Sequence, residues 1–153
     1  MDTLITLLEQ AEAERNQALA ALNHARARCE AARHQALQLD TYRAEYRQRW
    51  SAQFARGASL DIVRCYQAFA DRLEVAIAQQ DHAVGQAQAV QARAGDALTA
   101  HELRVASVRK LIERRTLAER QANERREQKA DDEHAMRMSL AGGRRSALAG
   151  VRA

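Results

Sequence analysis

The residues of this chain that could do chemistry are few, and their spacing does not assemble a catalytic or metal site. The five histidines are scattered from His24 to His134, so no metal-ligand set forms on one helix. The run Asp131–His134 joins three carboxylates to a histidine, but consecutive side chains spread around a helix instead of converging on one ion. The sequence has no phosphate-binding glycine loop, no HExxH, no Cys-x-x-Cys and no serine in a glycine elbow. We therefore expect a non-enzymatic protein with no cofactor and no metal.

The aromatic residues form a second group that could bind a partner. All of them lie between positions 42 and 69, namely Tyr42, Tyr46, Trp50, Phe54, Tyr66 and Phe69. One interpretation is that the rings staple a helix end that would otherwise fray. The other is a protein-binding patch, because exposed Tyr, Trp and Phe are typical interface anchors. Both can hold, with Trp50 and Tyr66 packing inward while Tyr42 and Phe69 show part of a face.

The elements that position these residues follow from a hydrophobic repeat, called the seam below. In the first half of the chain it comprises Leu4, Leu8, Ala11, Arg15, Ala18, Leu22, Ala25, Cys29, Ala32, Ala36, Leu39, Arg43, Tyr46 and Trp50. In the second half it comprises Tyr66, Phe69, Leu73, Ile77, Gln80, Val84, Ala87, Gln91, Ala94, Leu98, His101, Val105, Val108 and Ile112. A repeat of about 3.5 residues stays on one side only when helices supercoil around each other, so it predicts a coiled coil. The absence of proline and the abundance of alanine favour long thin helices over a globular core with a metabolite pocket.

One glycine-containing break near Gly57 separates the two halves of the seam. Because a short connection makes two helices antiparallel neighbours, residues whose numbers sum to about 116 should face each other. In this register Tyr46 faces Phe69, and Trp50 faces Tyr66. The predicted fold is all-α, a long antiparallel two-helix coiled-coil hairpin with helix one at about 3–55, a turn at about 56–59, helix two at about 60–138, and a disordered, flexible C-terminal tail at 139–153.

The predicted helices differ in length, so the second should overhang the first. Leu4 pairs near Ile112, which leaves the region from about 114 to 138 without a partner helix. This overhang has few apolar residues and carries oppositely charged pairs four apart, such as Arg115 and Glu119, each worth only a few tenths of a kcal/mol, on the order of 0.2–0.5. We expect the overhang to become ordered in a binding partner, and the alternative is a solvated helix end.

The charge distribution argues against nucleic acid as a partner. The formal net charge is +4, and three of these charges come from Arg144, Arg145 and Arg152 in an acid-free tail. The rest of the chain interleaves acidic and basic residues, which gives phosphate no coherent positive field. The chain shows no signal peptide and no membrane span, so we expect a cytoplasmic protein with Cys29 and Cys65 as reduced thiols.

Several short motifs, taken in order, resemble a known family. They are LDTYRAEYR at 39–47, YQAF at 66–69, Leu73-Glu74, Ala76-Ile77, and Glu127-Gln128-Lys129 leading to Asp132-Glu133. Together they resemble the flagellar export protein FliJ family, over nearly all of the chain up to Met138. The resemblance implies a coiled-coil stalk component of the bacterial flagellar type III protein export apparatus, at the cytoplasmic face of the membrane.

The resemblance also implies partners and the residues that meet them. Its partners are the hexameric flagellar export ATPase, the export gate protein FlhA, which is a membrane component, and export chaperones. The gate-facing set implied by position comprises Gln35, Leu39, Tyr42, Tyr46, Phe69, Leu73, Ala76 and Gln80. The family pattern has a histidine where this chain has Gln80, so no titrating group is carried over to that position. The ring-facing set comprises Arg114, Arg115, Arg120, Arg125, Glu127, Gln128, Lys129, Asp132 and Glu133.

Two other functions compete with the export stalk. A generic cytoplasmic coiled-coil scaffold or tether would self-associate through the same seam. A basic-helix nucleic-acid binder would read DNA with residues 114–129, where basic and acidic side chains alternate, and it would need a tight and strongly salt-dependent affinity.

Overall fold

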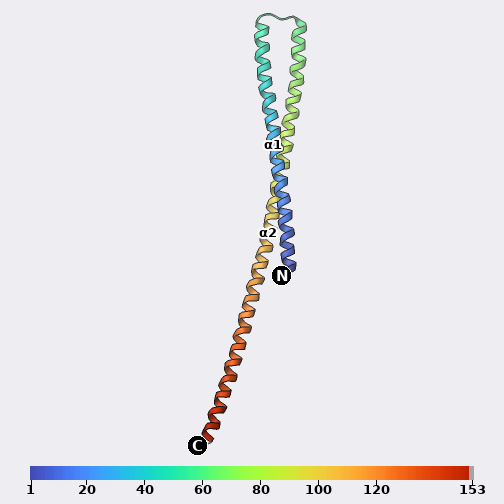
Figure 1. Ribbon diagram of the computed structural model, residues 1–153. Coiled ribbons are helices and arrows are strands. Elements are labelled where there is room, and N and C mark those ends of the chain that lie inside the picture. The colour runs from blue at the N-terminus through green and yellow to red at the C-terminus, as the bar shows by residue number, and fades with distance from the viewer. Residues whose placement is uncertain (152–153) are drawn as a thin grey trace. The chain divides into compact units, whose positions relative to one another are not determined.

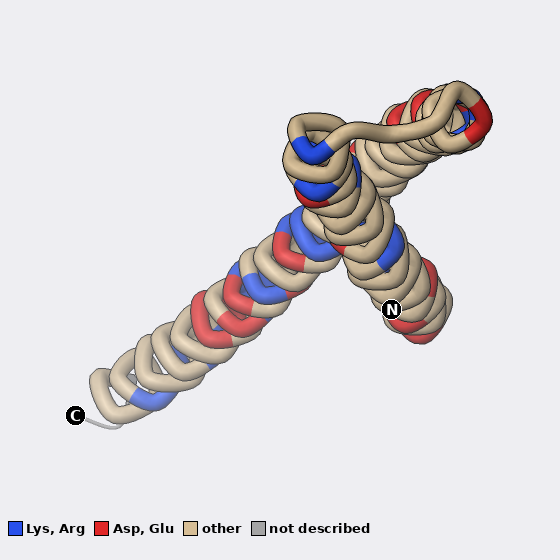
Figure 2. The backbone as a smooth tube through the Cα atoms, turned by 90° about the horizontal axis from the view of Figure 1, so that it is seen from above, with Lys and Arg blue, Asp and Glu red and all other residues tan. Residues whose placement is uncertain are grey.

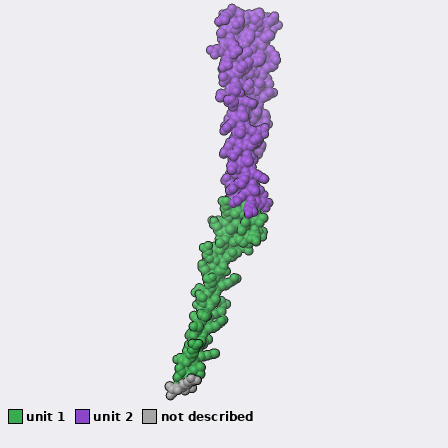
Figure 3. All heavy atoms as spheres, viewed as in Figure 1, with its two compact units in different colours: residues 1–8, 106–153 green, residues 9–105 purple. Residues whose placement is uncertain are grey.

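The chain consists of two helices joined by one reversal. The computed structural model describes residues 1–151, with α1 at Asp2–Ala55 and α2 at Leu60–Val151 (Figure 1). The described residues fall into two compact units (Figure 3). The hairpin unit is Glu9–Val105. The terminal unit joins Met1–Leu8 to the chain from Ala106 onward. The predicted all-α antiparallel hairpin is confirmed.

The reversal is built by a left-handed glycine and a helix cap. Gly57 has a φ of 94°, a conformation that glycine adopts without steric cost, and its N–H donates to the carbonyl of Phe54 at 3.0 Å. Ser59 then caps α2, because its Oγ accepts the N–H of Ile62 at 3.3 Å. The reversal therefore lies where the sequence predicts it, between Ala55 and Leu60.

The core of the hairpin unit is the predicted seam. Its buried hydrophobic residues are Ala11, Leu22, Ala25, Cys29, Leu73, Ile77 and Val105. Each belongs to the seam, and every other seam position of this unit is half-buried. Cys29 is 1% exposed and free, as expected for a small apolar residue that fills the seam, and the exposed Cys65 is free as well.

The antiparallel register also agrees with the prediction. Near the reversal, the rings of Trp50 and Tyr66 lie 5.7 Å apart between centroids. Further along the same unit, Arg104 Nη1 on α2 lies 3.3 Å from Glu14 Oε2 on α1. The residue numbers of both pairs sum close to 116, so the two helices keep one register through the hairpin unit.

The terminal unit contains the start of α1 and the long end of α2. Leu4 and Leu8 are half-buried in α1, Val108 is buried and Ile112 is half-buried in α2, and residues 113–150 are all exposed. The second helix therefore extends well past the residues that pair with the start of α1, as predicted.

The end of α2 differs from the sequence-based expectation. The helix does not stop near Met138 but continues to Val151, so residues 139–151 of the expected flexible tail are helical, whereas residues 152 and 153 lie outside the described part. The physical reason is that this stretch contains no proline and several alanines, leucines and arginines, which extend a helix at little cost once it has started. Within the described residues, neither helix has an apolar stretch long enough to cross a membrane.

Candidate functional site

The aromatic residues form one continuous cluster on the hairpin unit. Tyr46 lies at its centre, with ring centroids 4.6 Å from Phe69 and 5.4 Å from Tyr66, both on α2. Trp50 and Phe54 extend the cluster toward the reversal, with 5.5 Å between their ring centroids. Contacts between rings on α1 and α2 hold the helices together at this end. The expectation that the rings staple the reversal end is therefore supported.

The cluster also has an exposed side. Tyr42 is 43% exposed, whereas Tyr46, Trp50, Tyr66 and Phe69 are half-buried. Tyr42 still touches its neighbours, because its ring centroid is 6.2 Å from that of Tyr46 and 6.3 Å from that of Phe69. Desolvation by these surroundings raises the pKa of the Tyr46 phenol above its usual 10.0, while the side chain of Trp50 acts in the opposite direction. Tyr42 is thus the exposed tyrosine of the cluster, and its ring packs against the uncharged rings of Tyr46 and Phe69.

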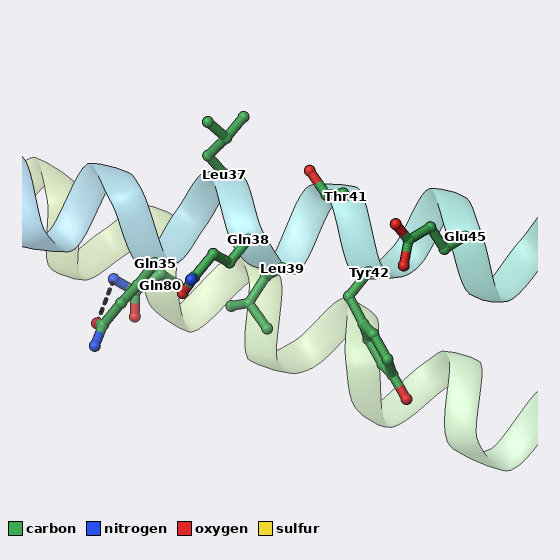
Figure 4. A pocket seen from close by; sticks show the side chains of 8 residues that line it. All are labelled: Gln35, Leu37, Gln38, Leu39, Thr41, Tyr42, Glu45 and Gln80. Atoms are coloured by element: carbon green, nitrogen blue, oxygen red, sulfur yellow. Dashed lines mark hydrogen bonds between the residues drawn. The ribbon is translucent and has the colours of Figure 1, made fainter.

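Beside Tyr42, a shallow groove runs along α1 and reaches Gln80 on α2 (Figure 4). Leu39 and Tyr42 point from α1 toward α2, while Leu37 points away from it (Figure 4). Gln80 donates its side-chain N–H to the backbone carbonyl of Ala32 at 2.9 Å and to the side-chain oxygen of Gln35 at 3.3 Å. Gln80 therefore ties the two helices together with an uncharged amide.

A charged network borders the aromatic cluster, and the sequence reasoning missed it. Glu74 on α2 accepts from Arg43 Nη1 at 3.0 and 3.2 Å and from Arg47 Nη2 at 3.0 Å. Arg43 also contacts Asp40 at 3.3 Å. The available signal was Arg43 itself: a charged residue at a seam position requires a partner, and Glu74 faces it in the predicted register.

The gate-facing set therefore divides into exposed and internal members. Gln35, Leu39, Tyr42 and Gln80 line the groove, and Tyr46 and Phe69 support Tyr42 from beneath. Leu73 is only 7% exposed, so it packs between the helices and offers no surface to a partner. The structure brings this set together within the hairpin unit. Its binding role remains a prediction.

The ring-facing set lies in the terminal unit and has a different character. All nine residues, from Arg114 to Glu133, are exposed and are spread over several faces of α2. Of the expected pairs four residues apart, Arg115 and Glu119 approach to 3.7 Å. Acidic and basic positions alternate along this part of α2 (Figure 2). In the described part of the chain, no group of three or more His, Cys, Asp or Glu residues is placed to hold a metal ion.

A comparison with known families agrees with this geometry. The family model described as "Flagellar FliJ protein" matches residues 1–144, which is almost the whole chain. Neither a curated protein nor a solved structure matches significantly.

Proposed function

Because this chain belongs to the family of flagellar FliJ proteins, we propose that it is a non-enzymatic stalk or adaptor of the bacterial flagellar type III protein export apparatus. In this proposal it acts in the cytoplasm, at the face of the membrane that carries the export apparatus. It couples the hexameric export ATPase to the export gate protein FlhA and escorts export chaperones. The observation that carries the proposal is that one chain offers an aromatic groove and, elsewhere, an exposed run of charged helix.

The aromatic groove is the surface we assign to FlhA. Tyr42 exposes nearly half of its surface and packs against Tyr46 and Phe69. Because these contacts already restrict its side chain, Tyr42 would lose little conformational entropy on binding, as suits an interface anchor. Leu39 and the paired amides of Gln35 and Gln80 extend the groove along α1. An apolar anchor beside satisfied polar groups is typical of protein-binding surfaces.

The charged run of α2 is the surface we assign to the ATPase ring. Residues 113–133 are exposed and carry both signs of charge. Inside the polar central channel of the ATPase ring, their contacts with water would be replaced by ion pairs with the ring, at a small desolvation cost. A helix of this composition is only marginally stable alone, and a surrounding ring would order it. The start of α1 belongs to the same unit and would meet the ring with it.

Two variants separate the assignments. A chain truncated after Ile112 should lose binding to the purified ATPase hexamer and keep binding to the soluble part of FlhA. Tyr42→Ala should do the reverse, with FlhA affinity falling by at least about tenfold, as expected for an aromatic interface anchor. Leu19→Ala is the matched control, because Leu19 is also 43% exposed and lies outside the gate-facing set. Ring binding that survives the truncation, or an equal loss of FlhA affinity in both point variants, would contradict the assignment.

Sedimentation velocity tests the competing scaffold function. A stalk that pairs its two helices within one chain should sediment as a monomer at micromolar concentration. A scaffold or tether would instead form a stable dimer or a larger bundle. A stable dimer whose formation requires the seam residues would count against the stalk.

A further inference from the structure

The last part of α2, residues 136–149, differs sharply from the charged run before it. The last acidic residue of the whole chain is Glu133, so only Arg137, Arg144 and Arg145 carry charge between positions 135 and 151. Figure 2 shows the same change, with acidic positions frequent in the middle of the terminal unit and none near its described end. This stretch therefore has a uniformly positive field.

Exposed apolar side chains are concentrated in the same stretch. Met136, Met138, Leu140 and Leu148 expose 67%, 63%, 62% and 68% of their surfaces. By contrast, Leu117 is the one large apolar side chain exposed between 113 and 135. Exposed apolar side chains that gather in one patch mark a protein or membrane interaction site more often than isolated ones do.

Most of the large residues share one face of the helix. At about 100° per residue, Met136, Arg137, Leu140, Arg144 and Leu148 fall within an arc of about 120°, whereas Arg145 and Met138 lie about 60–80° beyond it. Arg137, Leu140 and Arg144 also line one shallow surface hollow together with Ala141. Most of the opposite face is small or polar, with Ser139, Gly142, Ser146 and Gly150. The segment is thus amphipathic, with arginines set among its apolar side chains.

We propose that residues 136–149 of α2 adsorb directly onto an anionic phospholipid surface. The aliphatic side chains of Met136, Leu140 and Leu148 enter the boundary between headgroups and acyl chains, while the arginines extend along them to reach the phosphates. Nucleic acid would satisfy the arginines but would leave these apolar side chains in water, which is why lipid is the better fit. The inference is independent of the assignments to the ATPase and to FlhA.

Vesicle flotation of the full-length protein tests the proposal. The probes are vesicles of phosphatidylcholine alone and vesicles with about one third phosphatidylglycerol. Binding should require the anionic lipid and should weaken strongly between 50 and 500 mM NaCl. Because each arginine near an anionic surface contributes about fivefold, Arg144→Glu with Arg145→Glu should lower the partition coefficient by more than about tenfold. Leu140→Ser with Leu148→Ser should lower it by at least about fivefold, by removing apolar burial.

The control makes an equal change of charge elsewhere on the molecule. Arg26→Glu with Arg33→Glu alters two exposed arginines of α1 and should leave the partition coefficient within about twofold. Circular dichroism should show unchanged helix content in all three variants. The proposal is overturned if neutral vesicles bind equally well, or if the control falls as much as the Arg144 and Arg145 variant. It is also overturned if the leucine variant binds normally while heparin blocks all binding, because the segment would then be only a polyanion-binding site.

Discussion

The charged network around Glu74 gives a quantitative test of the pairing between the two helices. Arg43 occupies a seam position on α1, and Glu74 on α2 is its only interhelical ion-pair partner among the contacts of the described chain. We expect Glu74→Gln to destabilise the hairpin because Arg43 then loses its countercharge at a half-buried position. Arg47, whose Nη2 lies 3.0 Å from Glu74 Oε1, loses the same countercharge in this variant.

The magnitude follows from distance and exposure. Two unit charges about 4 Å apart attract by about 1 kcal/mol in water and about 4 kcal/mol at an effective dielectric constant of about 20. The side chains of Arg43 and Glu74 are 31% and 46% exposed, so solvent screening places the pair near the lower value. We expect a coupling free energy of about 0.5–1 kcal/mol between Arg43→Gln and Glu74→Gln in a double-mutant cycle.

Urea unfolding followed by circular dichroism measures this coupling for the four proteins of the cycle. The coupling should fall markedly between 50 and 500 mM NaCl, because half-exposed charges are screened. As a control, Arg33→Gln combined with Glu74→Gln should give additive effects, since Arg33 is exposed and lies several turns away from the residues that face Glu74. A coupling below about 0.3 kcal/mol, or one that salt does not change, would refute the ion-pair account of this contact.

Three further predictions use the same unfolding assay. Leu73→Ala should cost about 2–3 kcal/mol, at the lower end for a buried leucine, because a two-helix seam is open at its sides and can partly collapse; a cost below about 1 kcal/mol would contradict the observed burial. Gly57→Ala should cost about 1–2 kcal/mol from its left-handed backbone, although the added Cβ meets no atom within 4 Å; an unchanged unfolding midpoint would show that the reversal is not strained. The pKa of Tyr46 is raised in the folded state, so folding favours the neutral phenol. The contribution of this phenol to the free energy of unfolding is fully present below about pH 10, where the unfolded phenol is neutral, and is lost as the pH rises through the folded pKa. Tyr46→Phe should therefore reduce the loss of stability at alkaline pH, and an unchanged pH profile would assign that loss to other groups.

The fold could be predicted from the sequence because a two-helix coiled coil is specified by local spacing. Steps of four and three placed Leu22 and Cys29 on the seam face of α1 and Leu73 on the seam face of α2, and each of them is buried. The reversal was predictable as well, since Gly57 is the one glycine in the first half of the chain. The end of α2 could not be predicted, because its apolar stripe at 136–148 is short and is interrupted by Gly142 and Gly143, which lower helix propensity.

The aromatic cluster was predictable from the sequence, whereas the binding role of the gate-facing set stays a prediction. Residue spacing grouped Tyr42, Tyr46 and Phe69, and their rings are in contact. Tyr42 was expected to show part of a face, and it is 43% exposed. Leu73 is buried as its seam position indicates, so the resemblance alone placed it in the gate-facing set. The pairing of Glu74 with Arg43 could have been found from the seam and the register, whereas its contact with Arg47 could not, because Arg47 lies outside the seam.

The reversal at Gly57 also sets an order of events during synthesis. The aromatic contact between Tyr46 and Phe69 closes a short loop, whereas the contact between Glu14 and Arg104 joins residues 90 positions apart. Since the entropy cost of closure grows with loop length, pairing should nucleate at the aromatic end and zip away from it. While the chain emerges from the ribosome, the apolar stripe of α1 around Leu22 and Cys29 stays unpaired until α2 has emerged to about residue 94. The nascent protein is therefore most exposed to aggregation and proteolysis midway through its own translation.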